Sequence, residues 1–440
     1  MVTTTTALVR DDPTLRRLLT VTAVDTVGRG AFFTLTSLYL IGVAGLPAVT
    51  VGVGLTVAGG VGVLGSLAFG HLADRWSSRR MLVALHVLQG GALTGYVLVR
   101  DLPTLILVAS LVMLAQQGGA SVRSAAIGRA FRGDERVRIR ALMRTVTNAG
   151  IAAGTALAAI PLAIGSANAY RVTMVAAGLL FLGSAVLLLG LPAARIDARP
   201  APDGPAGPRV AGPYRDRRFL LLAALNGIFG MQFAVYEIAV PLWVVHHTEA
   251  PDVLVSPLLL INTALVIALQ VRLSRGTADL RGAARAMTWA GWLMALACLL
   301  WAVAGELPAI AAVLALLVAA AVHTLAEITS SAAGWSISFE LAPAGAIGAY
   351  QGVYGTGFAL GAMVAPLVVT ATAIELGTPG WALLGVLFLT AALATRVVIA
   401  RIPPTGTPEP TAPEPTAPEP TAPEPTAPEP TAPAARVQEA

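Results

Sequence analysis

The sequence predicts an all-α membrane protein whose twelve transmembrane helices form two pseudo-symmetric bundles of six. Three observations support this prediction. The chain is 56% hydrophobic and only 12% charged, which is about half the charge of a typical soluble domain. Its mean hydropathy is +0.74. Its apolar residues form long runs separated by short loops that contain arginine, and a chain this apolar can bury most of its surface only in lipid.

Twelve apolar segments follow one another along the chain, and each exceeds the ~18 residues needed to cross a bilayer. They span residues 18–43, 48–72, 80–99, 103–126, 142–165, 169–191, 219–246, 253–273, 284–304, 307–332, 345–373 and 380–400. An even number of crossings puts both termini on the same side of the membrane.

The arginines predict which side that is. They gather in alternate loops, whereas the remaining loops contain only Arg100 and Arg171. By the positive-inside rule, the arginine-bearing loops and both termini lie in the cytoplasm, and the chain is a multi-pass protein of the inner (plasma) membrane. The pI of about 9.9 does not indicate nucleic-acid binding, because the arginines are spread over short loops rather than clustered on one face.

The composition also divides the chain into regions. We expect a cytoplasmic N-terminus at 1–17, one six-helix bundle at 18–191, a Pro-, Gly- and Arg-rich cytoplasmic linker at 192–218, and a second bundle at 219–402. From Thr407 the chain repeats Thr-Ala-Pro-Glu-Pro, and proline at this density blocks regular structure, so we expect residues 403–440 to form a disordered cytoplasmic tail.

The two bundles resemble copies of each other. A shift of 201 residues places Arg17 on Arg218 and Asp25 on Asn226. The small-residue pair Gly150-x-x-x-Gly154 recurs as Gly357-x-x-x-Gly361. Two parallel halves with matching helix contacts suit a transporter that rocks one half against the other. The alternative is chance similarity between apolar helices.

Charged side chains inside a membrane are costly, so each of them is a candidate functional residue. Asp25 lies ~12 Å along the first segment from Arg17 at 1.5 Å per residue, one turn before Arg29. In one interpretation Asp25 carries protons or contacts a cationic cargo, and Arg29 tunes its pKa. In the other, Asp25 and Arg29 form a structural ion pair at i and i+4.

Further candidates lie in later segments. Glu237 precedes Pro241 by four residues and either lines a cavity or caps an outer gate. His323 and Glu327 stand one turn apart, and either relay a proton or anchor the cytoplasmic end of their helix.

The remaining candidates are two arginines and several uncharged polar side chains within the segments. Arg123 and Arg144, near the cytoplasmic boundary, are expected to pair with acids such as Asp74, Glu340 or Asp25, or to contact an anionic cargo. The candidates for cavity lining are Asn148, Asn226, Asn262, Gln232 and Tyr236.

No motif for catalysis is present. The sequence contains no Gly-x-x-x-x-Gly-Lys-Ser/Thr loop, no His-Glu-x-x-His or Cys-x-x-Cys, and no nucleophile elbow. We therefore expect no catalytic residue, no cofactor and no metal site, and we expect transport to draw on an ion gradient, with protons as the first choice. A polytopic enzyme would need a cluster of histidines or acids at one membrane face, and a sensor would need a folded soluble domain.

The short loop between the second and third segments has the most specific motif. It reads Gly-His-Leu-Ala-Asp-Arg-Trp-Ser-Ser-Arg-Arg-Met-Leu over residues 70–82. This resembles the loop of the major facilitator superfamily, Gly-x-Leu-Ala-Asp-Arg-x-Gly-Arg-Arg/Lys-x-x-Leu, with Gly70, Asp74, Arg75 and Arg79 in register. The resemblance covers residues 16–402. It implies that Asp74 and Arg75 latch the cytoplasmic side closed, with Asp74 near the N-terminus of the eleventh helix.

Within that superfamily the chain is most similar to the twelve-helix drug:proton antiporters. Of their motif Gly-x-x-x-Gly-Pro-x-x-Gly-Gly, Gly150 and Gly154 are present, whereas Thr155 replaces the proline. Of their motif Arg-x-x-Gln-Gly, only Gln117-Gly118 remain, because position 114 is leucine. The resemblance implies a monomer in the lipid bilayer that exports small amphipathic molecules (multidrug efflux) in exchange for protons by alternating access. The alternative is a proton-coupled importer of a nutrient.

Overall fold

The computed structural model describes residues 9–198, 212–277 and 279–402. All regular structure within these residues is helical, and twelve helices are long and apolar enough to cross a membrane. The predicted all-α membrane fold is therefore confirmed. Three predicted regions lie wholly or partly outside the described residues, namely the start of the N-terminus (1–8), the middle of the linker (199–211) and the tail (403–440).

The first half of the chain contributes six spans. They are α2 (Pro13–Leu38) with the π-helical turn η1 (Tyr39–Val43), α3 (Ala48–Arg75), α4 (Ser78–Gly95) with η2 (Tyr96–Leu98), α5 (Leu102–Ala130), α6 (Asp134–Ile164) and α7 (Ala167–Leu189). Polar residues begin several of these helices. The Asp12 carboxylate, for example, accepts hydrogen bonds from the amides of Thr14 and Leu15, and Pro13 supplies the first helical residue.

The second half contributes the other six spans. They are α9 (Arg217–Gly230), α10 (Gln232–Ala234), η3 (Val235–Ala239) and α11 (Val240–His247) as one span, then η4 (Asp252–Leu254) with α12 (Val255–Leu273), α13 (Leu280–Ala304), α14 (Ala309–Glu340), α15 (Ile347–Val369) with η5 (Thr370–Ile374), and α16 (Thr378–Ala400). The π-helical turn η3 immediately precedes Pro241, where the missing amide of proline interrupts regular α-helical bonding.

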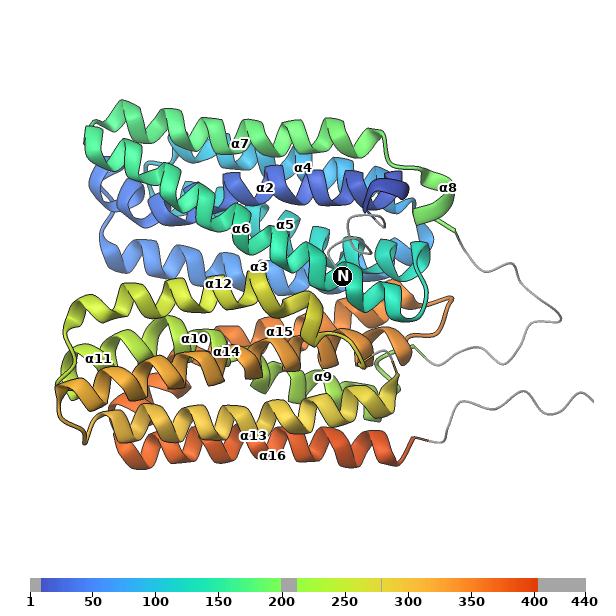
Figure 1. Cartoon of the computed structure of the whole chain (residues 1–440). Helices are drawn as coiled ribbons and strands as arrows, with labels where there is room; N and C mark the ends of the chain where they lie inside the picture. Colours follow the sequence, from blue (N-terminus) through green and yellow to red (C-terminus); the bar gives the residue numbers. More distant parts are fainter. Residues whose placement is uncertain (1–8, 199–211, 278, 403–440) are drawn as a thin grey trace, which may run out of the picture. The chain divides into compact units, whose positions relative to one another are not determined.

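Each half is built around its own hydrophobic core. In the first half, Leu35, Tyr96 and Phe181 are fully or almost fully buried. In the second half, Trp301 and Trp381 are fully buried. Figure 1 shows α2–α7, coloured blue to green, gathered on one side of the molecule, and α9–α16, coloured yellow-green to red, on the other.

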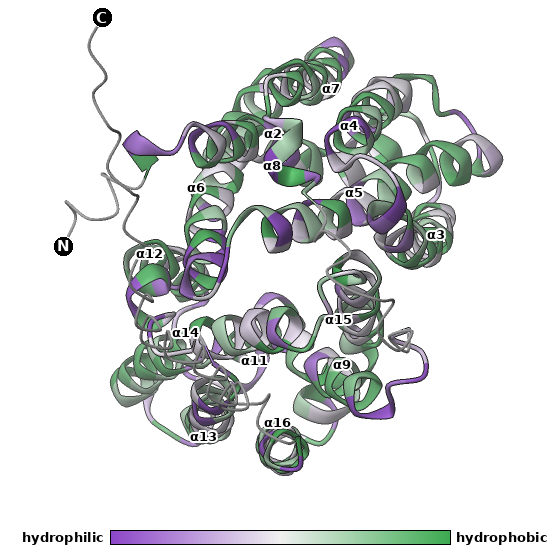
Figure 2. Cartoon of the chain, turned by 90° about the vertical axis from the view of Figure 1, so that its right-hand side faces the viewer, coloured by the Kyte–Doolittle hydropathy of each residue, from purple (hydrophilic) through white to green (hydrophobic). Residues whose placement is uncertain are grey.

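The loops fall at two ends of the helices, as Figure 1 shows. We call the end that holds the loops at 76–77, 131–133, 274–279 and 341–346 the arginine-rich end. The loops at 44–47, 99–101, 165–166 and 305–308 lie at the opposite, arginine-poor end. In Figure 2, which looks onto the arginine-rich end, apolar residues predominate on the helices at the periphery.

The glycine pairs occupy equivalent places in the two halves. A Cβ atom at Gly150 or Gly154 of α6 would collide with α2, at Thr26 and at the Val27 carbonyl respectively. A Cβ atom at Gly357 or Gly361 of α15 would collide with the backbone of α9. Since both pairs bring a helix against the first span of its own half, the internal repeat expected from the sequence is present in the packing.

Several helices extend further at the arginine-rich end than their apolar runs. The fifth spanning helix, α6, begins at Asp134 and not at 142, and α14 continues to Glu340 and not only to 332. Apolar runs mark the crossing of the hydrocarbon core, whereas arginine and glutamate, which are frequent in the added part of α6, are good helix formers that continue a helix beyond it. As a result Glu327 lies thirteen residues before the end of α14, or ~20 Å at 1.5 Å per residue.

The start of the predicted linker packs against the first half. It forms the short helix α8 (Ala193–Ile196). Arg195 pairs with Asp12 at 2.8 Å, and Asp197 accepts a hydrogen bond of 2.6 Å from the Ser78 amide at the beginning of α4. The prediction of a polar linker at 192–218 did not include this ordered segment. Within α8 the buried residue is Ile196.

Candidate functional site

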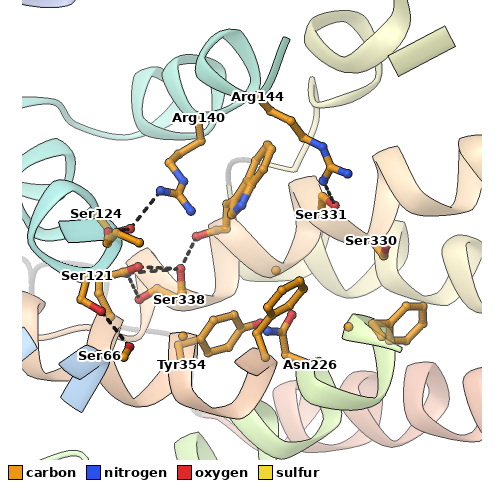
Figure 3. Close-up of a pocket in the computed structure, with 18 of the residues that line it drawn as sticks. Ser66, Ser121, Ser124, Arg140, Arg144, Asn226, Ser330, Ser331, Ser338 and Tyr354 are labelled. Atoms are coloured by element: carbon orange, nitrogen blue, oxygen red, sulfur yellow. Dashed lines mark hydrogen bonds between the residues drawn. The ribbon is translucent and has the colours of Figure 1, made fainter. Parts of the chain in front are cut away.

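A cavity of ≈ 300 Å³ lies between the two halves. Its walls come from α3, α5 and α6 of the first half and from α9, α10, α14 and α15 of the second. Hydroxyl groups are its most frequent polar feature, and Figure 3 shows several of them around the same space. The serines that line the cavity are Ser66, Ser121, Ser124, Ser330, Ser331 and Ser338.

Small residues on facing helices leave room for this cavity. At Gly334 of α14, a Cβ atom would come within 3.0 Å of the Asn226 side-chain oxygen and 3.4 Å of the Tyr354 hydroxyl. At Gly355 of α15, it would lie 3.2 Å from the Ser66 hydroxyl. Larger side chains at either position would fill the space that a bound molecule needs.

Helix α6 presents a row of arginines to the second half. Arg136, Arg140 and Arg144 follow one another at one-turn intervals, and each guanidinium lies over an aromatic ring of the opposite half at 5.4 to 5.8 Å from the ring centroid. We call these three residues the arginine row. Their ring partners are Phe339, Trp335 and Phe233 respectively. Of the row, Arg140 and Arg144 line the cavity.

Arg144 forms an ion pair with Glu327 across the two halves. Its guanidinium donates hydrogen bonds to the Glu327 carboxylate and to the Ser331 hydroxyl, both on α14. The second Glu327 oxygen accepts a 2.8 Å hydrogen bond from the Asn262 amide of α12. Because only 15% of the Arg144 side chain and 5% of the Glu327 side chain are exposed, this pair ties α6 to both helices in a largely dry setting.

A second charged group lies inside the first half. Asp25 of α2 is fully buried, and one of its carboxylate oxygens lies 3.3 Å from the Arg123 guanidinium and 3.4 Å from His86 Nε2. Among the described residues these two are the basic groups within 4 Å of Asp25. Of the two interpretations of Asp25, the structural ion pair with Arg29 at i and i+4 is therefore not found, because the carboxylate is directed toward α4 and α5 rather than along its own helix.

The hydrogen bonds of His86 require a proton between His86 and Asp25. His86 Nδ1 lies 2.8 Å from the Leu82 carbonyl oxygen, which can only accept, so Nδ1 holds a proton. A hydrogen bond from Nε2 to Asp25 then needs a second proton, either on Nε2 or on the carboxyl group. If that proton leaves, a lone pair on nitrogen faces a carboxylate oxygen, and the contact becomes repulsive.

The last turn of α3 joins the halves at the arginine-rich end. The two oxygens of Asp74 accept hydrogen bonds of 2.7 Å from the amides of Gly348 and Ala349, the second and third residues of α15. A carboxylate at this position satisfies free amides and complements the positive end of the helix dipole. Gly70 permits the approach, because a Cβ atom there would lie 2.7 Å from the Gly348 carbonyl oxygen.

The arginines around this turn make contacts that the resemblance does not specify. The cation that pairs with Asp74 is Arg129 of α5, at 3.2 Å, and not Arg75, which is exposed. Arg79 donates to the carbonyl oxygens of Leu189 and Leu191 at the end of α7. Arg129 also donates to the Ser78 hydroxyl at 2.7 Å, so it holds the loop in shape within the first half.

The other predicted residues are divided between the cavity and the helix interiors. Asn226 and Gln232 line the cavity. Tyr236 is buried and donates its hydroxyl to the Leu258 carbonyl at 2.7 Å, and its ring packs against His323. Glu327 is hydrogen-bonded to Arg144 and Asn262. Neither Asn148 nor the exposed Glu237 is among the residues that line the cavity.

Sequence reasoning missed His86, Arg129 and Arg140 as site residues. His86 had a usable signal, since it is one of five histidines in the chain and stands in the middle of an apolar segment. Arg129 and Arg140 were assigned to cytoplasmic loops, because they lie outside the apolar runs 103–126 and 142–165. The extension of α5 beyond its run brings Arg129 to Asp74, and the extension of α6 brings Arg140 to the interface.

Comparison with known proteins gives one family match. The profile of the Major Facilitator Superfamily matches residues 18–366. A search of curated proteins found no match.

Solved structures share the fold at low sequence identity. The human organic anion transporter MFSD10 (TETRAN) matches with a TM-score of 0.65 and 16% identity, over 87% of this chain and 100% of that one. A bacterial homologue of the iron transporter ferroportin, in an outward-facing state, matches with a TM-score of 0.66 and 14% identity, over 88% and 99% of the two chains. The proton:xylose symporter XylE matches with a TM-score of 0.64 and 14% identity, over 86% and 94%.

Proposed function

The chain belongs to the Major Facilitator Superfamily, and from that premise we propose that it is a proton-coupled secondary transporter that exports small amphipathic molecules by alternating access. The cavity between the halves, with its hydroxyl and aromatic lining, supports a site for a small molecule. The glycine pair of α6 supports the exporter type, since it matches the first part of the antiporter motif.

The contact between Asp25 and His86 is the observation that supports proton coupling most directly. This contact joins α2 to α4 and requires one proton between the two side chains. Arg123 of α5 pairs with the same carboxylate and keeps its charge throughout. Loss of the proton breaks the link to α4 and leaves the link to α5. A change in protonation thereby changes which helix α2 is tied to.

The orientation and the state follow from the same reasoning. We assign the arginine-rich end to the cytoplasm by the positive-inside rule. The contacts of Asp74 with α15 and of Arg144 with α14 join the halves on the cytoplasmic side of the protein. We infer that these contacts hold the arginine-rich end closed.

Proton movement in inverted membrane vesicles tests the proposal. The vesicles are energised, a fluorescent dye reports the pH gradient, and matched cationic, neutral and anionic compounds are added. The variants are Asp25→Asn and His86→Gln, with Asp101→Asn as the control, because Asp101 is an exposed acid at the beginning of α5.

We expect at least one compound to dissipate the gradient in the wild type and in Asp101→Asn. In Asp25→Asn the rate should fall at least tenfold. In His86→Gln the fall should be similar, because a glutamine amide donates permanently to Asp25 and removes the proton-dependent contact. Equal rates in Asp25→Asn and the wild type would refute the role of Asp25, and a wild type that no compound affects would refute proton-coupled export.

A further inference from the structure

We propose that the cargo of this transporter is an organic anion, whose carboxylate-like group binds Arg140 in the cavity between the halves. This inference rests on the proposed function, since it specifies the molecule that the transporter moves. It differs from the cationic cargo that Asp25 alone suggested.

Arg140 has the geometry of a binding group with unused donors. Its guanidinium donates one hydrogen bond of 2.9 Å to the Ser124 hydroxyl, and its flat face lies 5.5 Å from the centre of the Trp335 ring. A guanidinium has five N–H donors in a planar fork that matches a carboxylate. Figure 3 shows Arg140 reaching from α6 toward Ser124, on the same side of the cavity as Ser121 and Ser338.

The charges around the cavity leave Arg140 without a counter-ion. The residues that line the cavity include two arginines and no acid. Arg144 is neutralised by Glu327, whereas no carboxylate of residues 9–198, 212–277 or 279–402 lies within 4 Å of Arg140. An uncompensated positive charge inside a membrane protein is costly. A cargo carboxylate would compensate it, and a cationic cargo would be repelled by it.

The rest of the cavity fits the body of such a molecule. Trp335, Phe233 and Phe358 contribute aromatic walls, and the hydroxyls of Ser121 and Ser338 lie near the charged end. A cavity of ≈ 300 Å³ stands at the lower limit for small-ligand sites. We therefore infer a compact amphipathic anion, with an aromatic or aliphatic ring at one end and an acid group at the other.

Binding to the purified full-length protein in detergent tests this inference without transport. The probes are 2-naphthoate, the neutral 2-naphthamide and the cationic 2-naphthylmethylamine, which share one ring system and differ in charge. Affinity is measured by isothermal titration and, independently, by quenching of tryptophan fluorescence. The variants are Arg140→Gln and Arg140→Lys, with Arg132→Gln as the matched control, because Arg132 is exposed just before α6.

We expect 2-naphthoate to bind the wild type and Arg132→Gln at least tenfold more tightly than the amide or the amine. Arg140→Gln should lose at least tenfold in affinity for 2-naphthoate, and Arg140→Lys should recover part of it through charge alone. The inference is overturned if 2-naphthoate fails to bind the wild type, if the amide or the amine binds as tightly, or if Arg140→Gln binds like the wild type.

The vesicle assay separates this inference from the proposed function. If cationic compounds dissipate the gradient while 2-naphthoate does not bind, the anion inference fails and proton coupling stands. If 2-naphthoate binds through Arg140 but no compound moves protons, the proposed coupling fails and the anion site stands.

Discussion

Asp74→Asn should favour opening of the arginine-rich end. In the present state the Asp74 carboxylate accepts two 2.7 Å hydrogen bonds from the amides at the beginning of α15. A hydrogen bond to a charged group contributes ~1.5–3 kcal/mol. Asparagine keeps the size of the side chain and one acceptor oxygen, but it loses the second acceptor and the charge that the helix dipole favours.

The expected shift is ~2 to 3 kcal/mol toward the open arrangement. At about 1.4 kcal/mol per factor of ten, the population with an open arginine-rich end rises about 30- to 150-fold. These hydrogen bonds exist only while α3 and α15 are together, so their full contribution enters the equilibrium between the two states.

Alkylation of a cysteine inside the cavity measures this population. The single cysteine, Cys298, is buried and is first removed as Cys298→Ala. A reporter is introduced as Ser338→Cys, since Ser338 lines the cavity on α14. A maleimide is added to inverted vesicles, and its rate of reaction reports access from the arginine-rich end.

The control is Arg75→Gln, which removes a charge from the same loop without touching α15. We expect faster alkylation in Asp74→Asn and an unchanged rate in Arg75→Gln. The reasoning is refuted if Asp74→Asn reacts no faster than its parent, or if Arg75→Gln accelerates the reaction to the same extent.

Two further predictions concern the interface between the halves. Arg144→Gln should destabilise the protein by ~3 kcal/mol, because the Glu327 carboxylate then stays buried without its cation. The thermal unfolding midpoint in detergent should fall, and adding Glu327→Gln should restore most of the lost stability. An equal fall of the midpoint in the double variant contradicts this account. Gly70→Ala should accelerate alkylation of the cavity cysteine at least as much as Asp74→Asn, because its Cβ atom would lie 2.7 Å from a backbone oxygen of α15. The control Gly59→Ala should not accelerate it, because nothing lies within 4 Å of a Cβ atom at that position. Equal rates in the two glycine variants would exclude the steric explanation.

The fold was predictable from the sequence because its determinants are local. The length of an apolar run sets a span, and the twelve predicted runs correspond to the twelve spanning helices. The position of Asp74 at the beginning of α15 was also predictable, but only through the resemblance, since no local pattern relates residue 74 to residue 348.

The charge partners were not predictable in the same way. Asp25 pairs with side chains of α4 and α5, and Arg144 pairs with α14, so both depend on the rotation of separate helices about their axes. Sequence spacing indicates only which residues share a face of one helix, so it offered Arg29 as one partner of Asp25. The partner that the structure confirms, Arg123, was one of several possible pairings between an arginine and an acid. Arg140 was missed for a different reason, because hydropathy marks the end of the hydrocarbon and not the end of the helix.

The two kinds of contact between the halves respond differently to displacement. Asp74 meets two particular free amides, and a shift of one residue along α15 would place one of its oxygens at the Tyr350 amide, which is already bonded to the Ala346 carbonyl oxygen. The arginine row lies on flat aromatic faces, and a guanidinium can slide over such a face by an ångström or more while it stays within the ~6 Å range of the interaction. The hydrogen bonds of Asp74 are therefore either formed or lost. The contacts of the arginine row weaken gradually and keep the halves aligned during the movement.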